Sequence, residues 1–391
     1  MAEFFNTGLS QQDFLEQYWQ KKPLVIRQAL KQFKSPISPE DLAGLACEPD
    51  IESRLIQEFG SQGSWQVRHG PFSEQDFETL PATHWTLLVQ DVDKHVPDTQ
   101  AILDPFRFIP DWRRDDLMIS YAPEHGTVGP HTDGYDVFLL QVMGTRRWQI
   151  SDQPLIKPDL LKGLDLQILA EFDPDHTWDL HAGDILYLPP YFAHHGMALN
   201  DCMTFSVGFR APSQTDMLDA VINSLLEHNL ATGRYHDPDL LVAAHQSEID
   251  PAAIARLKQL LHQTIEQAEP VLAEALGNYV TETKSSLAVL AEEAISDIPD
   301  IDQISQEFKL GHTLKRNLYY RFAWTEYDDY AQLFLAGVSY RVDKKDVQLL
   351  PMLTENPVIT NNDWQHIITS SSLAELLCQL IAEGGWYWQV S

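Results

Sequence analysis

The sequence predicts an α+β protein in which an antiparallel barrel or jelly roll is followed by helices and a small mixed module. Two observations favour this fold class. From Leu117 to Arg210 the chain consists of short apolar strands separated by Gly and Pro, which is typical of antiparallel sheets. After Pro212 the strands stop, and apolar residues recur every three or four positions, as in an amphipathic helix. At 391 residues, the chain is long enough for two or three domains.

The N-terminal part begins with short helical and extended pieces. Phe14, Tyr18 and Trp19 recur at helical spacing, and the apolar residues 24–26 indicate a buried strand. The strands expected in the barrel are LMISYA (117–122), DVFLLQV (136–142), RRWQI (146–150), DILYLPP (184–190) and MTFSVGF (203–209).

The C-terminal part is expected to be helical first and mixed later. Residues 214–261 are dominated by an amphipathic helical pattern, and a second helical run reaches about Ile295 before a linker, SDIPDID (296–302). The expected elements of the final part are the strands NLYYRFAW (317–324) and AQLFLAGVSYRV (331–342), the helix LAELLCQLIA (373–382) and a closing segment, GGWYWQV (384–390).

Acidity is the strongest feature of the composition. The 57 acidic side chains outnumber the 27 basic ones, and the formal net charge is -30. Such a surface repels nucleic-acid phosphates, whose binding depends on Lys and Arg, and it attracts basic proteins by long-range steering. Acidity also serves solubility, so charge alone selects no substrate.

The composition further indicates a reducing compartment. The three cysteines, Cys47, Cys202 and Cys378, are few and far apart, which argues against a disulfide framework. No run of about eighteen uncharged apolar residues suggests a membrane span, and the first residues lack the pattern of a signal peptide. We therefore expect a cytoplasmic protein without membrane contact.

Two segments contain the residue types of a metal site. In Gly129-Pro-His131-Thr-Asp133 the imidazole and the carboxylate are two positions apart, so on a strand they would face the same side. The segment His181-Ala-Gly-Asp-Ile-Leu-Tyr-Leu-Pro-Pro-Tyr-Phe-Ala-His194-His195 supplies a further imidazole. Two histidines and one carboxylate form the facial triad of non-haem Fe(II) oxygenases, in which the opposite face is open for cosubstrate and oxygen.

The residues alone do not identify the third ligand. Strand alternation is ambiguous between His194 and His195, because Phe192 and Met197 support opposite phases. His181 is a third candidate, at the other end of the preceding strand. The histidine that does not bind metal would lie behind the site or on the surface.

A cation for a cosubstrate carboxylate is expected at Arg146. In the strand RRWQI, Arg146 alternates with the apolar Trp148 and Ile150 and should face the interior, whereas Arg147 should face outward. A buried arginine without a carboxylate partner is costly, and a bound dicarboxylate such as 2-oxoglutarate would compensate it. The alternative is a structural salt bridge to an internal acid.

At several motifs the sequence resembles the bacterial JmjC-type ribosomal oxygenases, which hydroxylate an arginine of a large-subunit ribosomal protein. The motifs are FLEQYWQKKPLVIR, SPEDLAGLA, WQVRHGPF, LMISYAPEHGTVGPHTDGYDVFLLQ, GDILYLPPYFAHHG and FSVGFRAP. They are dense over residues 1–212. Farther on, the resemblance lies in the overall plan of the chain.

The resemblance implies a residue for each role. Iron would be bound by His131, Asp133 and His194, and 2-oxoglutarate by Arg146 and Ser120. The domains would be a JmjC-type jelly roll at 1–212, a helical dimerisation segment at 213–295 and a winged-helix-like module at 296–391. The reaction implied is hydroxylation of the β-carbon of an arginine in a basic ribosomal protein, and the oligomer is a homodimer. The sequence departs from the family in the loop PEHGTVG, with Glu124 and His125, and at His195.

Carboxylates and aromatic rings are expected around the substrate guanidinium, and Asp136, Tyr135 and Tyr121 are candidates near the metal motif. Alternative functions are the same chemistry on a histidine or another basic protein, and a non-catalytic cupin-like binding module. Direct nucleic-acid binding by the C-terminal module is not expected, because its basic residues are balanced by acidic ones.

Overall fold

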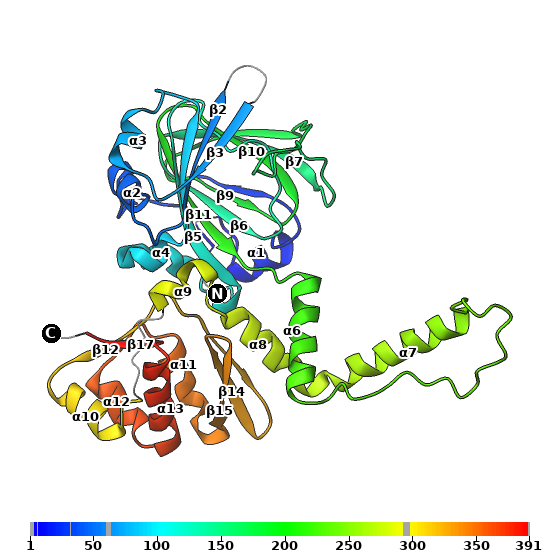
Figure 1. Ribbon diagram of the computed structural model, residues 1–391. Helices are drawn as coiled ribbons and strands as arrows, with labels where there is room; N and C mark the ends of the chain where they lie inside the picture. The colour runs from blue at the N-terminus through cyan, green and yellow to red at the C-terminus, as the bar shows by residue number, and fades with distance from the viewer. Residues whose placement is uncertain (1–3, 6, 32, 60–63, 292–297, 390–391) are drawn as a thin grey trace. The chain divides into compact units, whose positions relative to one another are not determined.

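The computed structural model describes residues 4–5, 7–31, 33–59, 64–291 and 298–389. They form two compact units (Figure 1). The N-terminal unit comprises residues 1–211 and 284–290, and the C-terminal unit comprises residues 212–283 and 291–391. The division of function into three domains stays a prediction. None of the described helices is both long and apolar enough to cross a membrane.

The N-terminal unit contains two antiparallel sheets. The strands of the large sheet, in spatial order, are β1 (Leu24–Ile26), β9 (Ile185–Leu188), β6 (Val137–Met143), β11 (Cys202–Phe209), β5 (Arg114–Ala122), β4 (Trp85–Val89), β2 (Ser53–Phe59) and β3 (Ser64–His69). The small sheet consists of β10 (Phe192–Ala198), β7 (Thr145–Pro154) and β8 (His176–His181). The predicted α+β fold with an antiparallel two-sheet barrel is confirmed, including all five strands expected between 117 and 209.

Strand β6 lies between two cores because both of its faces are apolar. Val137 and Leu139 pack with Trp148 of β7 and other residues of the small sheet, so the two sheets face one another. Phe138 and Leu140 belong to the larger core on the other side of the sheet. This packing places the inner faces of the two sheets around a common interior.

Short helices complete the N-terminal unit. Helix α1 begins with a capping box between Ser10 and Asp13, and α2 begins with one between Ser38 and Asp41, in which each serine accepts a backbone N–H that the helix leaves free. The helices are α1 (Gln11–Gln17), α2 (Pro39–Leu45), α3 (Glu74–Glu78), α4 (Val92–His95), α5 (Gln100–Leu103) and α9 (Ser285–Ala291), with 3-10 turns at Pro97–Thr99, Asp104–Phe106 and Asp111–Arg113.

The C-terminal unit combines two small sheets with helices. Its strands are β12 (Thr313–Arg316), β16 (Val358–Ile359) and β17 (Trp386–Gln389) in one sheet and β13 (Phe322–Glu326), β14 (Tyr330–Leu335) and β15 (Val338–Asp343) in the other. Its helices are α6 (Gln214–Glu227), α7 (Pro251–Gln267), α8 (Leu272–Thr281), α10 (Ile301–Lys309), α11 (Leu350–Thr354), α12 (Asn361–Ile367) and α13 (Ser371–Ala382), with 3-10 turns at Glu269–Val271 and Lys344–Leu349.

Helix α8 packs closely on this second sheet. A Cβ at Gly277 would lie 2.5 Å from the ring of Phe334 on β14, so only glycine permits the contact. The expected helix at 373–382 is present, whereas the expected strand 317–324 is a strand only from Phe322. The single strand expected at 331–342 is instead a hairpin of β14 and β15, because the chain turns at Ala336 and Gly337, which both have a positive φ.

The helical pattern at 214–261 was predicted too broadly. Between α6 and α7, residues 228–250 contain no helix, and α7 begins only after Asp250, whose side chain caps it at Ala253 N. Gly233 and Pro238 in this stretch are poor helix formers. The expected linker 296–302 lies partly outside the described residues, as does Ile295, and α10 begins within it at Ile301.

The apolar stripe of α7 is uncovered within the described residues. No residue of this helix is buried. Its exposed apolar residues, at helical spacing, are Ile254, Leu257, Leu261 and Ile265, and those of α6 are Leu218, Ile222 and Leu226.

Candidate metal and cosubstrate site

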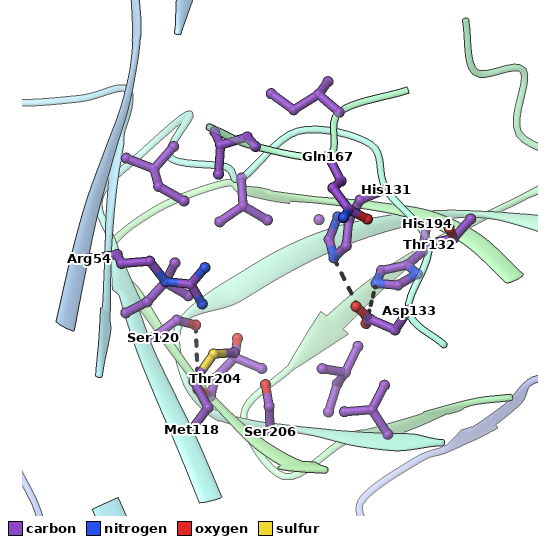
Figure 2. Close-up of a pocket in the computed structure, with 18 of the residues that line it drawn as sticks. Arg54, Met118, Ser120, His131, Thr132, Asp133, Gln167, His194, Thr204 and Ser206 are labelled. Carbon is purple, nitrogen blue, oxygen red and sulfur yellow. Dashed lines mark hydrogen bonds and ion pairs between the residues drawn. The ribbon is translucent and has the colours of Figure 1, made fainter. Parts of the chain in front are cut away.

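A cavity of about 650 Å³ opens between the sheets of the N-terminal unit (Figure 2). One wall consists of alternate residues of β5 and β11 on the inner face of the large sheet. Another comes from the connection between β7 and β8, where Leu160, Leu161 and Ile168 make it apolar. The polar residues described below all line this cavity unless another position is stated.

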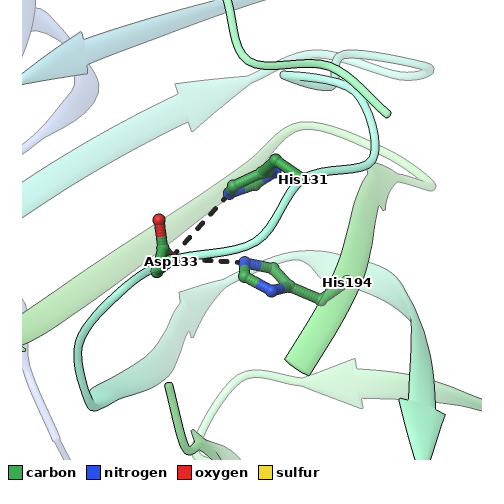
Figure 3. A group of neighbouring side chains, drawn as sticks. All are labelled: His131, Asp133 and His194. Carbon is green, nitrogen blue, oxygen red and sulfur yellow. Dashed lines mark ion pairs between the residues drawn. The ribbon is translucent and has the colours of Figure 1, made fainter. Parts of the chain in front are cut away.

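His131, Asp133 and His194 converge at the cavity (Figure 3). One potential ligand atom from each lies within 4.8 Å of the other two. Asp133 Oδ2 is 3.5 Å from His194 Nε2 and 3.9 Å from His131 Nε2. Three such atoms at this separation could surround a single ion.

Both imidazoles are oriented in the same way by the backbone. His131 Nδ1 is 2.9 Å from the carbonyl oxygen of Gly129, and His194 Nδ1 is 2.9 Å from that of Phe192. Because a carbonyl only accepts, each Nδ1 carries the proton and each Nε2 presents its lone pair to the site. Burial, followed by the effect of neighbouring His131, lowers the pKa of His194 to about 4, so this ring stays neutral at physiological pH.

Of the three candidates for the third ligand, only His194 directs its side chain at His131 and Asp133. His195 turns away and pairs through Nε2 with Thr127 Oγ1 at 2.9 Å, and His181 lies near Thr145 on the outside. In the pairing of β10 with β7, His194 lies opposite Ile150, on the inward face, and His195 lies opposite Gln149, on the other face. Met197, which supported the opposite phase, lies opposite the outward-facing Arg147.

The strand expected to carry His131 and Asp133 is absent. These residues precede β6, and His131 makes only an isolated bridge with His194. The backbone N–H and C=O of His131 both bond to His194, at 3.0 and 2.9 Å, while the carbonyl of Asp133 accepts from Tyr191 N. The two residues therefore converge through a loop held on β10, and not through strand alternation.

Arg146 faces the cavity, and Arg147 faces outward, as the alternation predicted. Arg146 is 3% exposed, and its Nη1 donates to Ser120 Oγ at 3.2 Å and Thr204 Oγ1 at 3.3 Å. Arg147 pairs instead with Asp179 at 2.7 Å. Among the residues that the structure describes, no carboxylate lies within ion-pair distance of Arg146, so the alternative of an internal salt bridge has no support.

Ser120 and Thr204 lie opposite one another on β5 and β11. Thr204 Oγ1 also donates to Gln141 Oε1 at 3.0 Å, which directs the threonine hydroxyl. Thr204 was not predicted, although it alternates with Ser206 and Gly208 on the same strand. Burial lowers the pKa of Arg146, as expected for a cation without a counter-charge.

Another carboxylate, Asp116, lines the cavity on β5, two positions from Met118. Its Oδ2 accepts from Asp91 N at 3.3 Å. With the Gln90 amide oriented so that its oxygen accepts from Arg54 Nη2 at 2.8 Å, its nitrogen donates to the same Asp116 oxygen at 3.1 Å. Burial, which the charge of Lys284 opposes, raises the pKa of Asp116 to about 7. The carboxylate thus has one oxygen held by two donors.

The other oxygen of Asp116 lies beside Gly208. A Cβ at Gly208 would be 3.2 Å from Asp116 Oδ1 and 4.0 Å from the ring of Tyr135, which also lines the cavity. Glycine therefore leaves space between a carboxylate and an aromatic ring.

Two of the three residues expected to hold a guanidinium are elsewhere. Asp136 is buried outside the cavity, where it accepts from Tyr187 at 2.6 Å and from Gln20 at 2.9 Å. Tyr121 packs against Trp85 and does not line the cavity either. Only Tyr135 lies where it was expected, and Asp116 was missed because it is far from the metal motif in sequence.

The unusual loop residues also lie away from the cavity. His125, with a φ of 65°, stacks near His84 at a centroid distance of 4.9 Å, and neither His125 nor Glu124 lines the cavity. The two residues by which this loop departs from the family therefore lie outside the candidate site.

Family models match most of the chain. Residues 101–217 match the JmjC domain, and residues 250–387 match the ROXA-like winged helix. The chain is 34% identical over 390 residues to the ribosomal protein uL16 3-hydroxylase of Escherichia coli, covering 98% of this chain and 99% of that protein. It is 35% identical to a probable ribosomal oxygenase of Haemophilus influenzae, covering 75% and 74%.

Solved structures give the same assignment. The structure of the ribosomal oxygenase YcfD from Escherichia coli in complex with cobalt and 2-oxoglutarate is similar with a TM-score of 0.79 and 32% identity, covering 98% of this chain and 99% of that one. The complex with cobalt and succinic acid is similar with a TM-score of 0.79 and 33% identity, at the same coverage. The chain belongs to the JmjC ribosomal oxygenases, and its C-terminal module is the winged helix of that family.

Proposed function

We propose that this protein is an Fe(II)- and 2-oxoglutarate-dependent hydroxylase of an arginine in a large-subunit ribosomal protein, with uL16 as the target. The observation that carries the proposal is that the histidine–carboxylate triad, a buried uncompensated arginine and a further carboxylate all line one cavity. A ribosomal protein is basic, which suits a chain of net charge -30, and the reaction would take place in the cytoplasm.

His131, Asp133 and His194 would hold the iron. Two neutral imidazoles and one carboxylate are the ligand set that suits Fe(II) with open coordination positions. When bound, iron with 2-oxoglutarate and O₂ supplies the oxidant for a C–H bond, while the cosubstrate is converted to succinate and carbon dioxide. The backbone carbonyls of Gly129 and Phe192 keep both Nε2 atoms directed at the ion.

Arg146 would bind the far carboxylate of 2-oxoglutarate. Its side chain is fixed by Ser120 and Thr204, so the guanidinium is already oriented before the cosubstrate arrives. A carboxylate there would also supply the counter-charge that the described residues around Arg146 lack.

Asp116 would bind the guanidinium of the target arginine. Oδ2 is held by protein donors, which leaves Oδ1 and the space at Gly208 for the substrate, with the ring of Tyr135 on the other side. Carboxylate and aromatic ring are the two groups that guanidinium prefers. The apolar wall that includes Ile168 would exclude water from the reacting carbon.

The same chemistry on a histidine or another basic protein is the second candidate. An imidazole carries a charge only below its pKa of about 6.5, whereas guanidinium is always charged, so the Asp116 carboxylate favours arginine. A non-catalytic cupin-like module would not need two histidines whose Nε2 atoms both face Asp133, so the arrangement of the triad disfavours this alternative.

Mass spectrometry would test the proposal. The protein would be incubated with Fe(II), ascorbate, 2-oxoglutarate and uL16 or its arginine-containing peptides, with parallel histidine peptides. We expect a gain of one oxygen atom on an arginine of uL16. Succinate formed with oxidation of histidine alone would select the second candidate, and iron-loaded protein that forms no succinate would contradict the oxygenase function.

Asp116→Asn is expected to weaken arginine binding selectively. Loss of a charge-assisted hydrogen bond costs about 1.5–3 kcal/mol, so the KM for the arginine substrate should rise by roughly 10- to 100-fold. The KM for 2-oxoglutarate should be unchanged because Asp116 is distinct from the Arg146 contact. Steady-state kinetics on uL16 peptide would measure both constants. Asp179→Asn, on the outer face beside Arg147, is the control, and an equal rise there would contradict the assignment.

We further propose that the apolar stripe of α7 is covered by a second copy of the chain. Leu257→Asp combined with Leu261→Asp would introduce charges into this stripe, and we expect a monomer in sedimentation velocity experiments where the natural chain is a dimer. Gln263→Asp adds a charge to the opposite face of the same helix, since successive residues differ by about 100°. A dimer that resists the double substitution would contradict this interface.

A further inference from the structure

A small second cavity adjoins the substrate end of the main one. Its volume is about 160 Å³. Four residues line both cavities, namely Gln90, Asp116, Tyr135 and Gly208. The small cavity extends from this shared wall to Lys284, which follows α8 in the sequence but belongs to the N-terminal unit. Asp116 therefore also borders the small cavity, to which the proposed reaction assigns no role.

Lys284 makes two ion pairs in this region. Its Nζ lies 2.8 Å from Asp91 Oδ1 and 3.2 Å from Asp115 Oδ1, and the side chain is 23% exposed. Asp91 is the residue whose backbone N–H donates to Asp116 Oδ2. Asp91 has a left-handed backbone conformation, with a φ of 50°. It contacts both Lys284 and the carboxylate of Asp116.

The charges around Asp116 are mostly negative. Asp91 and Asp93 precede or begin α4, Asp115 is its neighbour on β5, and Glu52 lines the small cavity beside β2. The other polar and charged groups on the elements packed here include Arg54, which reaches Asp116 through Gln90, and Lys94, which pairs with Asp93. His95 on α4 interacts with Asp91 and Asp93, and Ser286 and the hydroxyl of Tyr135 complete the set.

Lys284 therefore pairs directly with both Asp91 and Asp115. Although burial opposes it, the carboxylates of Asp116, Asp115 and Asp91 raise the pKa of Lys284, so the lysine remains charged. The charge of Lys284 also lowers the pKa of Asp116, against the effects of burial and of the other carboxylates.

We infer that Lys284 is a positioning residue for substrate recognition, which keeps the Asp116 carboxylate ionised and in place for the guanidinium of the target arginine. This inference rests on the proposed function. A residue from the segment after α8 would thereby control a substrate contact in the barrel, without itself touching the substrate. The expected consequence is a dependence of arginine binding on pH that changes when the lysine is removed.

The direction of the pH effect on the KM for arginine follows from the charge of Asp116. An ionised Asp116 binds guanidinium, and a protonated one does not, so the KM for arginine rises as pH falls through the pKa of Asp116. Without Lys284, the surrounding carboxylates hold the proton on Asp116 to higher pH. An opposite charge nearby shifts a pKa by about 1–3 units. A shift of about one unit would raise the KM near pH 7 by about fivefold, and most of the loss should disappear near pH 9.

The experiment compares Lys284→Met, Lys284→Arg and the natural protein in kcat/KM for uL16 peptide from pH 6 to 9. We expect the acid limb of Lys284→Met to move to higher pH, with kcat little changed, and Lys284→Arg to restore the natural profile. Binding of Mn(II) and 2-oxoglutarate, followed by calorimetry, should be the same in all three, which reports that the barrel is folded. Lys344→Met removes a lysine–carboxylate pair of the C-terminal unit and serves as the control.

Three results would overturn the inference. These are an unchanged acid limb in Lys284→Met, a loss that is equal at every pH, and a lower KM, which would mean that the carboxylates simply attract the substrate better without the lysine. Failure of the natural protein to hydroxylate arginine is a different outcome, because it contradicts the proposed function. Asp116→Asn separates the two, since it should weaken binding whether or not Lys284 has a role.

Discussion

His194→Ala is expected to abolish hydroxylation by removing one of the proposed ligands of the iron. Changes to residues behind a metal ligand typically cost 10- to 100-fold in affinity or activity, so loss of the ligand itself should exceed about 100-fold. The substituted position is fully inside the barrel, where His194 meets His131 at a centroid distance of 4.2 Å.

The neighbouring histidine provides a matched control. His195→Ala removes an imidazole of the same size from the next position, where the ring contacts Thr127 Oγ1 and not the proposed iron site. We expect metal binding within about threefold of the natural protein, the scale of a lost surface-type hydrogen bond. Titration with Co(II), followed by its visible absorption, would measure metal binding independently of hydroxylation. Metal loss in His195→Ala with retention in His194→Ala would exchange their roles.

The comparison of the two histidines also illustrates what the sequence can predict. The residue types and the order of the motifs limited the third ligand to His194, His195 or His181. The choice required the register of β10 on β7, which sets His194 opposite the inward-facing Ile150 and has no local signal in the sequence. Resemblance to the family selected His194, and the geometry agrees with that choice.

The alternation of inward and outward side chains predicted the orientation of residues correctly where the strand is regular and long. In β7, the inward position of Arg146 and the outward position of Arg147 followed from their apolar and polar neighbours. It failed at His131 and Asp133, which lie in a loop before β6. The residue types of the metal motif were therefore a sound reason to predict the site. The assumption that His131 and Asp133 alternate on a strand was wrong.

The substrate end of the cavity was beyond prediction from local patterns. Asp116, Gln90 and Arg54 come from β5, the end of β4 and β2, and they meet only because these strands are adjacent in the sheet. The candidates chosen near the metal motif, Asp136 and Tyr121, were close in sequence but point to other parts of the barrel. Proximity along the chain is a weak guide to a site that several strands share.

Arg146→Met is expected to reduce the affinity for 2-oxoglutarate by about 100-fold or more, because two charge-assisted hydrogen bonds of roughly 1.5–3 kcal/mol each would be lost. The same substitution should leave the cosubstrate-free protein at least as stable as the natural one. Arg146 is a buried cation without a carboxylate partner among the described residues, and its removal eliminates that desolvation cost. The hydroxyls that it contacts retain other acceptors, since Ser120 donates to Thr204 O and Thr204 donates to Gln141.

Thermal unfolding with and without 2-oxoglutarate would test both parts of this prediction. At a ligand concentration of 100 times Kd, binding stabilises a folded protein by about 2.7 kcal/mol, so the natural chain should gain several degrees and Arg146→Met should gain almost none. Arg147→Met, one residue along the same strand, loses an exposed pair with Asp179 and should keep the full ligand-induced shift. A cosubstrate-free Arg146→Met that is less stable, yet still stabilised by 2-oxoglutarate, would identify Arg146 as a structural residue. A cosubstrate-free Arg146→Met that is at least as stable as the natural chain, and that 2-oxoglutarate does not stabilise, would support the proposed role. It would mean that the fold tolerates a destabilising buried charge because the cosubstrate requires it.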